Sequence, residues 1–144
     1  MKGWQYELPF SHEQCKNLKS FFRTIFVFGA NEDGRHGKGA ALYARKHHGA
    51  VYGQGVGLQG NSYAIPTKNK SLIPLSLVVI KKYVDEFIEF AKRHPEMTFN
   101  ITAIGCGFTG YKPEQIAPMF KGVPGNCVLP EDFKKVYRGI NNVR

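Results

Sequence analysis

The chain has 144 residues, of which 42% are hydrophobic and 22% charged, and its formal net charge is +9. This length suits one domain with a real core, and the composition excludes a disordered chain. The longest apolar run, residues 72–80, is interrupted by Pro74 and Ser76, so no membrane segment is expected. The polar N-terminus likewise predicts no signal peptide.

The elements expected in chain order begin with a helix that a Ser11–Gln14 capping box starts and that ends near Phe22. β-Branched and aromatic residues at 24–28 predict a strand buried on both faces. The further strands expected are residues 61–65, ended by Pro66, 98–104 and 126–129, with a short strand opening the irregular stretch 50–58. The further helices expected are residues 39–48, 76–93, 113–120 and 131–140. This alternation predicts an α/β domain whose largely parallel sheet is covered on both sides.

Charge and cysteine usage limit the partners and the compartment. The basic excess favours an anionic partner such as nucleic acid or a nucleotide, although a Lys-rich surface explains it more simply. Cys15, Cys106 and Cys127 make an odd number without metal-type spacing. They indicate a reducing cytoplasm, and neither a disulfide framework nor a metal site is expected.

Two glycine-rich loops are the main chemical signal. One follows Phe28 and the other follows Ile104. Both are expected at the carboxyl ends of strands, where ligands bind in parallel sheets. The first loop leads into a helix whose free N–H groups favour anions, and glycine lets a phosphate approach the backbone. Lys38 is followed by Gly39, so the loop is not a Walker loop, and a dinucleotide fingerprint fails at Leu42. We expect a diphosphate bridged by both loops; the alternative is that the glycines only make turns.

Three segments together resemble the macrodomain family, which binds ADP-ribose and related nucleotides: "FGAN…GRHGKGAAL", "YAIPTK" and "ITAIGCGFTGYKPEQIAPMF". The resemblance covers about residues 24–120. It implies a three-layer α/β/α domain with a mixed, largely parallel sheet over residues 24–144, preceded by a helical extension at 1–23. The chain also resembles small phage or prophage proteins, which implies a bacterial-virus setting.

The resemblance also implies the ligand contacts. Asn31 corresponds to an asparagine that contacts the distal ribose, although a loop asparagine with a left-handed backbone is the alternative. Phe108 and Tyr111 are expected to stack on adenine or ribose, or else to pack at the core or rim. The full set expected to bind the ligand is Gly29, Ala30, Asn31, Gly37, Lys38, Gly39, Ala40, Gly105, Cys106, Gly107, Phe108, Thr109, Gly110 and Tyr111.

Lys68 is the main catalytic candidate. In a lysine-dependent branch of the family, a lysine at this place attacks the anomeric carbon and removes ADP-ribose from protein or DNA. That branch also uses an acid where this chain has Thr109, so the pair is incomplete. The alternatives for Lys68 are a solvated loop lysine or a phosphate contact.

Three other residues are candidates for activating a water molecule. Asn31 is expected to guide the water, with His36 or Asp33 as general acid or base. A Cys106–His36 nucleophile pair is a further alternative, but a small buried residue explains Cys106 more simply.

The predicted function is binding of ADP-ribose or a related nucleotide diphosphate and hydrolysis of an ADP-ribose derivative, at a glycosidic link or a phosphate monoester, without a cofactor. ADP-ribosylated protein or nucleic acid is the expected partner. One alternative is a non-catalytic phage protein that sequesters a nucleotide. Another is a charge-driven nucleic-acid binder, which the sequence supports less because it shows no aromatic-rich recognition strand.

Overall fold

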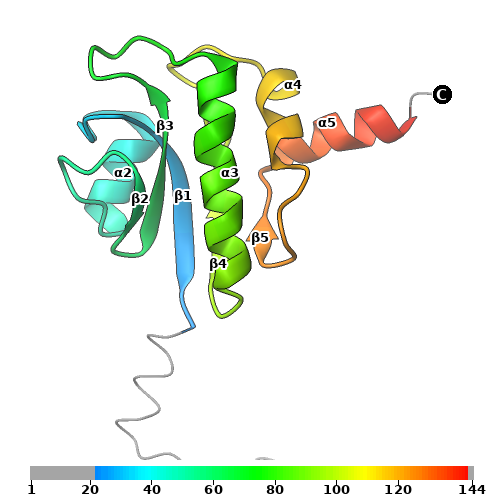
Figure 1. Cartoon of the computed structure of the whole chain (residues 1–144), viewed down its shortest axis with the longest axis horizontal. Coiled ribbons are helices and arrows are strands. Elements are labelled where there is room, and N and C mark those ends of the chain that lie inside the picture. The colour runs from blue at the N-terminus through cyan, green and yellow to red at the C-terminus, as the bar shows by residue number, and fades with distance from the viewer. Residues whose placement is uncertain (1–21, 143–144) are drawn as a thin grey trace, which may run out of the picture.

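A five-stranded sheet organises the computed structural model, which describes residues 22–142 (Figure 1). The strands are β1 (Thr24–Asn31), β2 (Gly57–Gln59), β3 (Ser62–Lys68), β4 (Thr98–Ile101) and β5 (Cys127–Val128). Their order in the sheet is β2-β3-β1-β4-β5. Only β2 is antiparallel to its neighbour, so the expected mixed, largely parallel sheet is confirmed.

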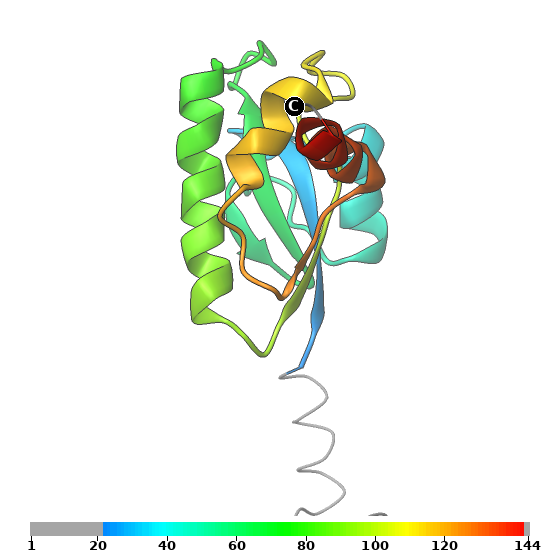
Figure 2. The same ribbon diagram turned by 90° about the vertical axis from the view of Figure 1, so that its right-hand side faces the viewer.

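Helices cover both faces of this sheet. They are α2 (Gly39–His47), α3 (Leu77–Arg93), α4 (Pro113–Ile116), the 3-10 helix η2 (Ala117–Phe120) and α5 (Glu131–Asn142). Figure 2 shows α3, in green, and α2, in cyan, on opposite sides of the strands. The arrangement is the three-layer α/β/α type that alternating strands and helices predict.

Alternating side chains of β1 build a separate core on each face. Ile25 and Val27 pack in the larger cluster, which includes Phe87 of α3. Phe28 packs in the smaller cluster, which includes Ala44 of α2. Successive side chains of a strand point to opposite faces, so one buried strand supports both helical layers.

Pro66 does not end β3, as the sequence predicts, because the strand continues to Lys68. β2 pairs with β3 only at residues 62–64, whereas Pro66 pairs with Ala30 of β1. Opposite Pro66 itself β2 has already ended, and proline is tolerated at such edge positions. The extra length places Lys68 level with Asn31 at the end of the sheet.

Other element boundaries also differ from the predictions. The strand expected to open residues 50–58 is wrong, since β2 begins only at Gly57. β4 ends at Ile101, before the expected residue 104, because the chain there turns into a loop. The helix expected at 113–120 is one α-helical turn followed by a 3-10 helix.

The predictions for the N-terminus concern residues outside the described part of the chain. The capping-box helix and Cys15 lie outside the described residues, as does nearly all of the extension expected at 1–23. Within residues 22–142, none of the helices combines the length and apolar character that crossing a bilayer demands.

Candidate functional site

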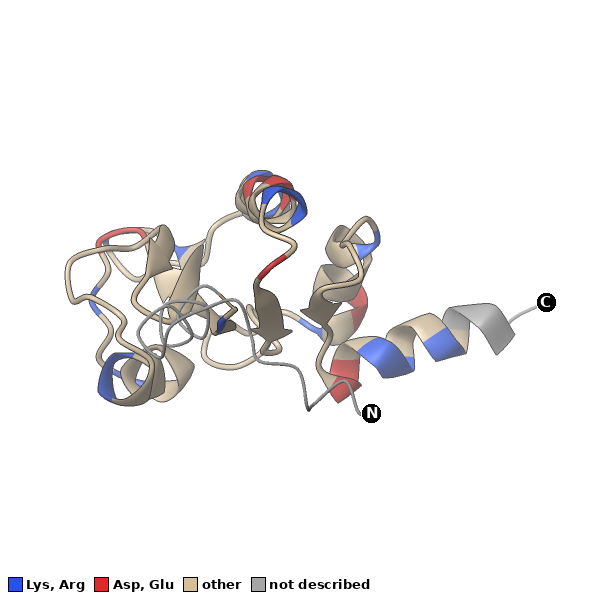
Figure 3. Ribbon diagram, turned by 90° about the horizontal axis from the view of Figure 1, so that it is seen from below, with Lys and Arg blue, Asp and Glu red and all other residues tan. Residues whose placement is uncertain are grey.

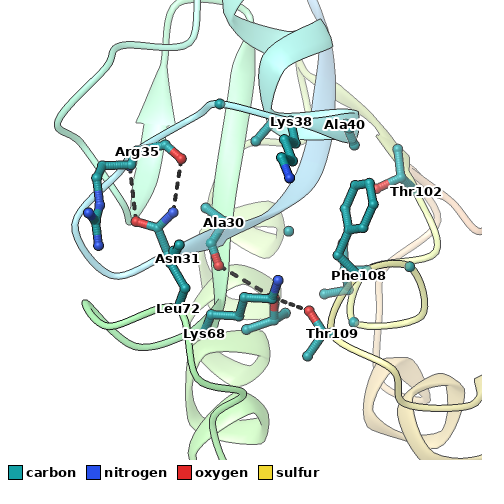
Figure 4. Close-up of a pocket in the computed structure, with 18 of the residues that line it drawn as sticks. Ala30, Asn31, Arg35, Lys38, Ala40, Lys68, Leu72, Thr102, Phe108 and Thr109 are labelled. Carbon is teal, nitrogen blue, oxygen red and sulfur yellow. Dashed lines mark hydrogen bonds between the residues drawn. The ribbon is translucent and has the colours of Figure 1, made fainter.

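A pocket of about 810 Å³ lies where β1, β3 and β4 end, between the start of α2 and the loop at 102–110 (Figure 4). Both glycine-rich loops contribute to its wall. The residues that line it are Gly29, Ala30, Asn31, Arg35, Gly37, Lys38, Gly39, Ala40, Ala41, Thr67, Lys68, Leu72, Thr102, Ala103, Ile104, Gly105, Gly107, Phe108 and Thr109. The site therefore lies at the carboxyl ends of parallel strands, where ligands bind in open α/β sheets.

The side chain of Asn31 closes the turn that begins the first loop. Its Nδ2 donates to the carbonyl of Arg35 at 2.9 Å, and its Oδ1 accepts from the amide of Arg35 at 3.0 Å. Asn31 is buried and borders the pocket. Its carboxamide thus shapes the loop, and the second N–H of Nδ2 and the second lone pair of Oδ1 are left for a ligand.

The start of α2 presents unpaired amides to the pocket. The first main-chain hydrogen bond of the helix runs from the amide of Leu42 to the carbonyl of Lys38, and no side chain caps this end. Within the described part of the chain, the amides of Gly39, Ala40 and Ala41 have no partner. These three residues line the pocket, at the positive end of the helix dipole.

The second loop supplies another row of free amides. Its turn is closed by hydrogen bonds from the amide of Gly110 to Gly107 and from the amide of Tyr111 to Gly105. The amides of Gly107, Phe108 and Thr109 have no partner among residues 22–142, and all three residues line the pocket. Consecutive free amides of this kind form anion-binding concavities.

Cations surround the same space. Arg35, Lys38 and Lys68 line the pocket, and among residues 22–142 no Asp or Glu belongs to its lining. In Figure 4 the ammonium groups of Lys38 and Lys68 point into the cavity from opposite sides. Lys68 Nζ lies 5.8 Å from the ring centroid of Phe108, and Arg35 donates to the carbonyl of Lys70. The pocket therefore attracts anions.

Thr109 ties the second loop to the sheet. Its Oγ1 lies 3.1 Å from Oγ1 of Thr67, which in turn donates to the carbonyl of Ala30 at 3.4 Å. Thr109 thus holds a hydroxyl, already in a hydrogen bond, at the place where the resemblance implies an acid in hydrolases. A hydroxyl cannot take up a proton near neutral pH as a carboxylate can.

His36 does not reach the pocket, contrary to its predicted role as acid or base. The side chain is fully buried, with its ring edge against Phe28 at 5.2 Å between centroids. Its Nε2 lies 3.0 Å from the carbonyl of Gln54 and 3.1 Å from Oε1 of Gln59. Both partners are acceptors, so Nε2 carries the proton and His36 supports the loop.

Asp33, Cys106, Gly110 and Tyr111 also lie outside the set that lines the pocket. Asp33 is exposed, and the hydroxyl of Tyr111 donates to the carbonyl of Leu75 at 2.6 Å. Burial, followed by the charges of Asp132 and Glu114, raises the pKa of the Cys106 thiol to about 11. Cys106 packs against the larger core cluster, on the α3 side of the sheet (the α3-side core). His36 contacts Phe28 of the smaller cluster, on the α2 side (the α2-side core), so the two residues form no nucleophile pair.

Several residues that line the pocket are not singled out by the sequence. Arg35 and Thr67 stand next to predicted positions, but the strand that carries Thr67 was expected to end at Pro66. Leu72 has a φ of +63°, because Asn69 Oδ1 accepts from the amides of Ser71 and Ile73 and tightens the turn. Arg35 and Ala41 fall within residues 31–41, which the sequence predicts to form one wall of the crevice, although neither was singled out as a ligand contact. The lining residues outside the predicted stretches are Thr67, Leu72, Thr102, Ala103 and Ile104.

Within residues 22–142, no three His, Cys, Asp or Glu side chains gather as the ligands of a metal ion would.

Comparisons with known proteins relate the chain to other proteins by fold alone. No protein-family model matches it, and neither does any curated protein. A protein of unknown function from Bacteroides thetaiotaomicron matches with a TM-score of 0.51 and 21% identity, over 69% of this chain and 78% of that one. A second structure from the same organism matches with a TM-score of 0.49 and 22% identity, over 68% and 79%.

Proposed function

We propose that the pocket binds ADP-ribose or a related nucleotide diphosphate, as the resemblance to macrodomains implies. The observation that carries the proposal is the convergence on one cavity of three cations and six amides that have no partner in the described part of the chain, which also supplies no carboxylate to the lining. Amides at a helix start and in a glycine loop are strong donors to phosphate oxygens. The two rows suit two adjacent phosphoryl groups.

The rest of the cavity supports a nucleotide rather than a bare phosphate. A volume of about 810 Å³ lies in the range of pockets that enclose small organic ligands. Leu72, Ile104 and Phe108 add apolar walls against which a base or ribose can pack. The three cysteines favour the reducing cytoplasm as its place of action.

We further propose hydrolysis of an ADP-ribose derivative through Lys68. Its ammonium group points into the cavity, and it is the only one of the four catalytic candidates whose reactive group is both at the pocket and outside a loop hydrogen bond. In this step the neutral amine of Lys68 would form an N–C bond at the anomeric carbon while the bond to the attached group breaks and that group leaves with a proton. Water would then hydrolyse the lysine adduct, which releases ADP-ribose and restores the amine.

A non-catalytic role is the second candidate. The absence of a carboxylate from the pocket lining favours it, because hydrolysis benefits from a group that moves a proton near neutral pH. In the phage setting that the sequence suggests, such a protein would sequester a nucleotide.

Calorimetry with ADP-ribose, AMP, NAD and cyclic nucleotides tests the binding proposal. We expect ADP-ribose to bind at least about tenfold more tightly than AMP, a difference of ~1.4 kcal/mol, because only ADP-ribose engages both loops with two phosphates. Equal or absent binding of the two overturns the proposal. Product release from ADP-ribosylated protein, ADP-ribosylated DNA and ADP-ribose-1″-phosphate then separates hydrolysis from sequestration.

A further inference from the structure

The positive charge of the chain is concentrated in one continuous stretch. Residues 34–84 contain eight Lys and Arg and no Asp or Glu, which is nearly the whole net charge of +9. They build α2, β2, β3 and the start of α3. Lys38 and Lys68 of this stretch lie in the pocket, whereas Arg45 and Lys46 lie further along α2, which appears with blue segments in Figure 3. Cations therefore extend beyond the pocket along this helix.

Exposed aromatic side chains accompany these cations. Ala40, Tyr43 and His47 are spaced i, i+3 and i+7 and so share a side of α2, with Ala40 at the pocket. Tyr43 is 51% exposed, with its ring centroid 4.6 Å from that of His47 and 5.5 Å from that of Phe26. The Tyr43 ring is thus held in place by its neighbours while about half of it faces solvent.

The neighbouring strand continues the same surface. Asn100 of β4 pairs in register with Phe26, so Asn100 and Tyr43 both flank that ring. Asn100 is exposed on the face of the sheet opposite Phe99, which packs in the α3-side core. Two residues further on, Thr102 lines the pocket. The surface made by Tyr43, Lys46, His47 and Asn100, here called the α2 surface, therefore begins at the mouth of the pocket.

We propose that the α2 surface binds single-stranded nucleic acid, with a base stacked on Tyr43 or His47 and the backbone phosphates beside Lys46. Exposed aromatic rings set among cations are how proteins hold single strands, because every base has a stacking face. A duplex hides its base faces, so it would use the cations alone. From Ala40 to His47 the helix rises ~10 Å, so a bound strand would pass the pocket mouth. The inference goes beyond the proposed function and does not depend on it.

Fluorescence anisotropy of the full chain with a labelled single-stranded oligonucleotide of about 12 nucleotides tests the proposal. We expect binding that weakens between about 50 and 200 mM salt, and binding of the matching duplex that is at least about tenfold weaker. Tyr43→Ala should weaken single-strand binding about tenfold. Tyr52→Ala is the matched control: Tyr52 is 58% exposed but contacts Arg45 and is not part of the α2 surface, so its loss should leave affinity unchanged.

A pair of charge reversals separates a local surface from a general effect of charge. Lys46→Glu and Lys82→Glu change the net charge equally, but Lys82 is exposed on α3, on the other side of the sheet. We expect Lys46→Glu to weaken single-strand binding about tenfold and Lys82→Glu to change it by less than about threefold. Equal effects of the two reversals, equal affinity for the duplex, equal effects of the two tyrosine variants, or no single-strand binding overturns the proposal.

Calorimetry with ADP-ribose distinguishes a failure of the α2 surface proposal from a failure of the proposed function of the pocket. Tyr43→Ala should retain the wild-type affinity for ADP-ribose and the wild-type circular dichroism spectrum. If the wild-type chain binds the single strand but not ADP-ribose, the α2 surface stands and the proposed function fails. If it binds ADP-ribose but not the single strand, the α2 surface fails and the proposed function stands.

Discussion

A Cβ atom at Gly39 would lie 2.8 Å from Cε2 of Phe108, so the two glycine loops meet at a contact in which a side chain at Gly39 would force the ring to shift. Gly39 also has a φ of +57°, a conformation that L residues rarely adopt. Phe108 is 73% exposed, and its ring lies against Gly39 of the first loop. One glycine thus starts α2 and makes room for the ring of the opposite loop.

Gly39→Ala should lower the free energy of unfolding by about 1–2 kcal/mol, because it adds both backbone strain and a clash with the ring. In a Phe108→Ala background the clash is absent, so the same change should cost less, but not zero, since the strain at φ +57° stays. Urea unfolding of the four proteins in this double-mutant cycle measures both parts. Equal cost in the two backgrounds would contradict the contact.

Gly37→Glu tests the pocket without this complication. A Cβ at Gly37 would meet nothing within 4 Å, and Gly37 has no positive φ. The added carboxylate would face Lys38 and the free amides, so ADP-ribose should bind at least about tenfold less tightly in calorimetry. Gly122→Glu is the control, because Gly122 is equally open but lies away from the pocket. Unchanged affinity of Gly37→Glu would argue against an anion site.

Lys68→Ala should abolish any release of product from ADP-ribosylated substrates, because it removes the proposed nucleophile. Binding of ADP-ribose should weaken by less than about tenfold, since Lys38 and the amides stay in place. Lys70→Ala is the control: it is exposed, and only its main-chain carbonyl contacts Arg35. Turnover is measured by chromatography of released product, and turnover retained by Lys68→Ala removes lysine catalysis.

Gln59 is expected to be a stability determinant of the loop that buries His36. Its Oε1 accepts from the amide of Val51 at 2.8 Å and lies 3.1 Å from His36 Nε2, while its Nε2 donates to the carbonyls of Gln54 and Gly57. Gln59→Ala should lower the free energy of unfolding by about 2–3 kcal/mol, because buried partners lose their hydrogen bonds.

Gln115→Ala is the matched control for Gln59→Ala. The Gln115 side chain also bonds to the backbone, accepting from the amide of Lys112 at 2.9 Å, but it is exposed. Water replaces the lost bond there, so the cost should be about 0.5–1 kcal/mol in urea unfolding. Equal costs at the two positions would mean that burial of the Gln59 cluster contributes nothing.

The two described cysteines should react slowly and make stability fall at high pH. Burial raises the pKa of Cys106 and of Cys127 from 9.0 to about 11. At pH 8 the folded protein would then hold about a hundredfold less thiolate than the unfolded chain. Mass spectrometry of iodoacetamide adducts on a Cys15→Ser variant, with and without urea, measures the difference.

The same pKa shifts fix the sign of the pH dependence. The folded thiols hold their protons more tightly than the unfolded ones, so their contribution to stability is complete below about pH 9. It is lost as the pH rises through about 11. Urea unfolding at rising pH should show this decline, and a Cys106→Ala, Cys127→Ala double variant should show less of it.

The local sequence predicted the order and type of most elements well. The apolar stripe of α3, with Ile80, Val84 and Phe87 buried, follows directly from helical spacing, and Ser76 accepts from the amide of Val79 as a cap should. Ala-rich residues followed by Gly49 likewise predicted α2. These features depend on neighbours within a turn or two of helix, so the local sequence is enough to predict them.

The ends of strands were less predictable, as β3 shows. Whether proline ends a strand depends on whether the missing N–H faces a partner, and at Pro66 it does not, because β2 has already ended. The early end of β2 is a relationship between residues of three strands, β1, β2 and β3. Because β3 continues past Pro66, Thr67 and Lys68 reach the pocket.

The sequence by itself determined the two side-chain-poor loops and their place after buried strands, because glycine content and strand periodicity are local properties. Only the tertiary structure decided which side chains share the cavity. His36 and Lys38 are two residues apart, yet the first is enclosed by Phe28 and Gln59 while the second points into the pocket. The direction of each side chain is set by packing between segments distant in sequence, which local composition does not encode.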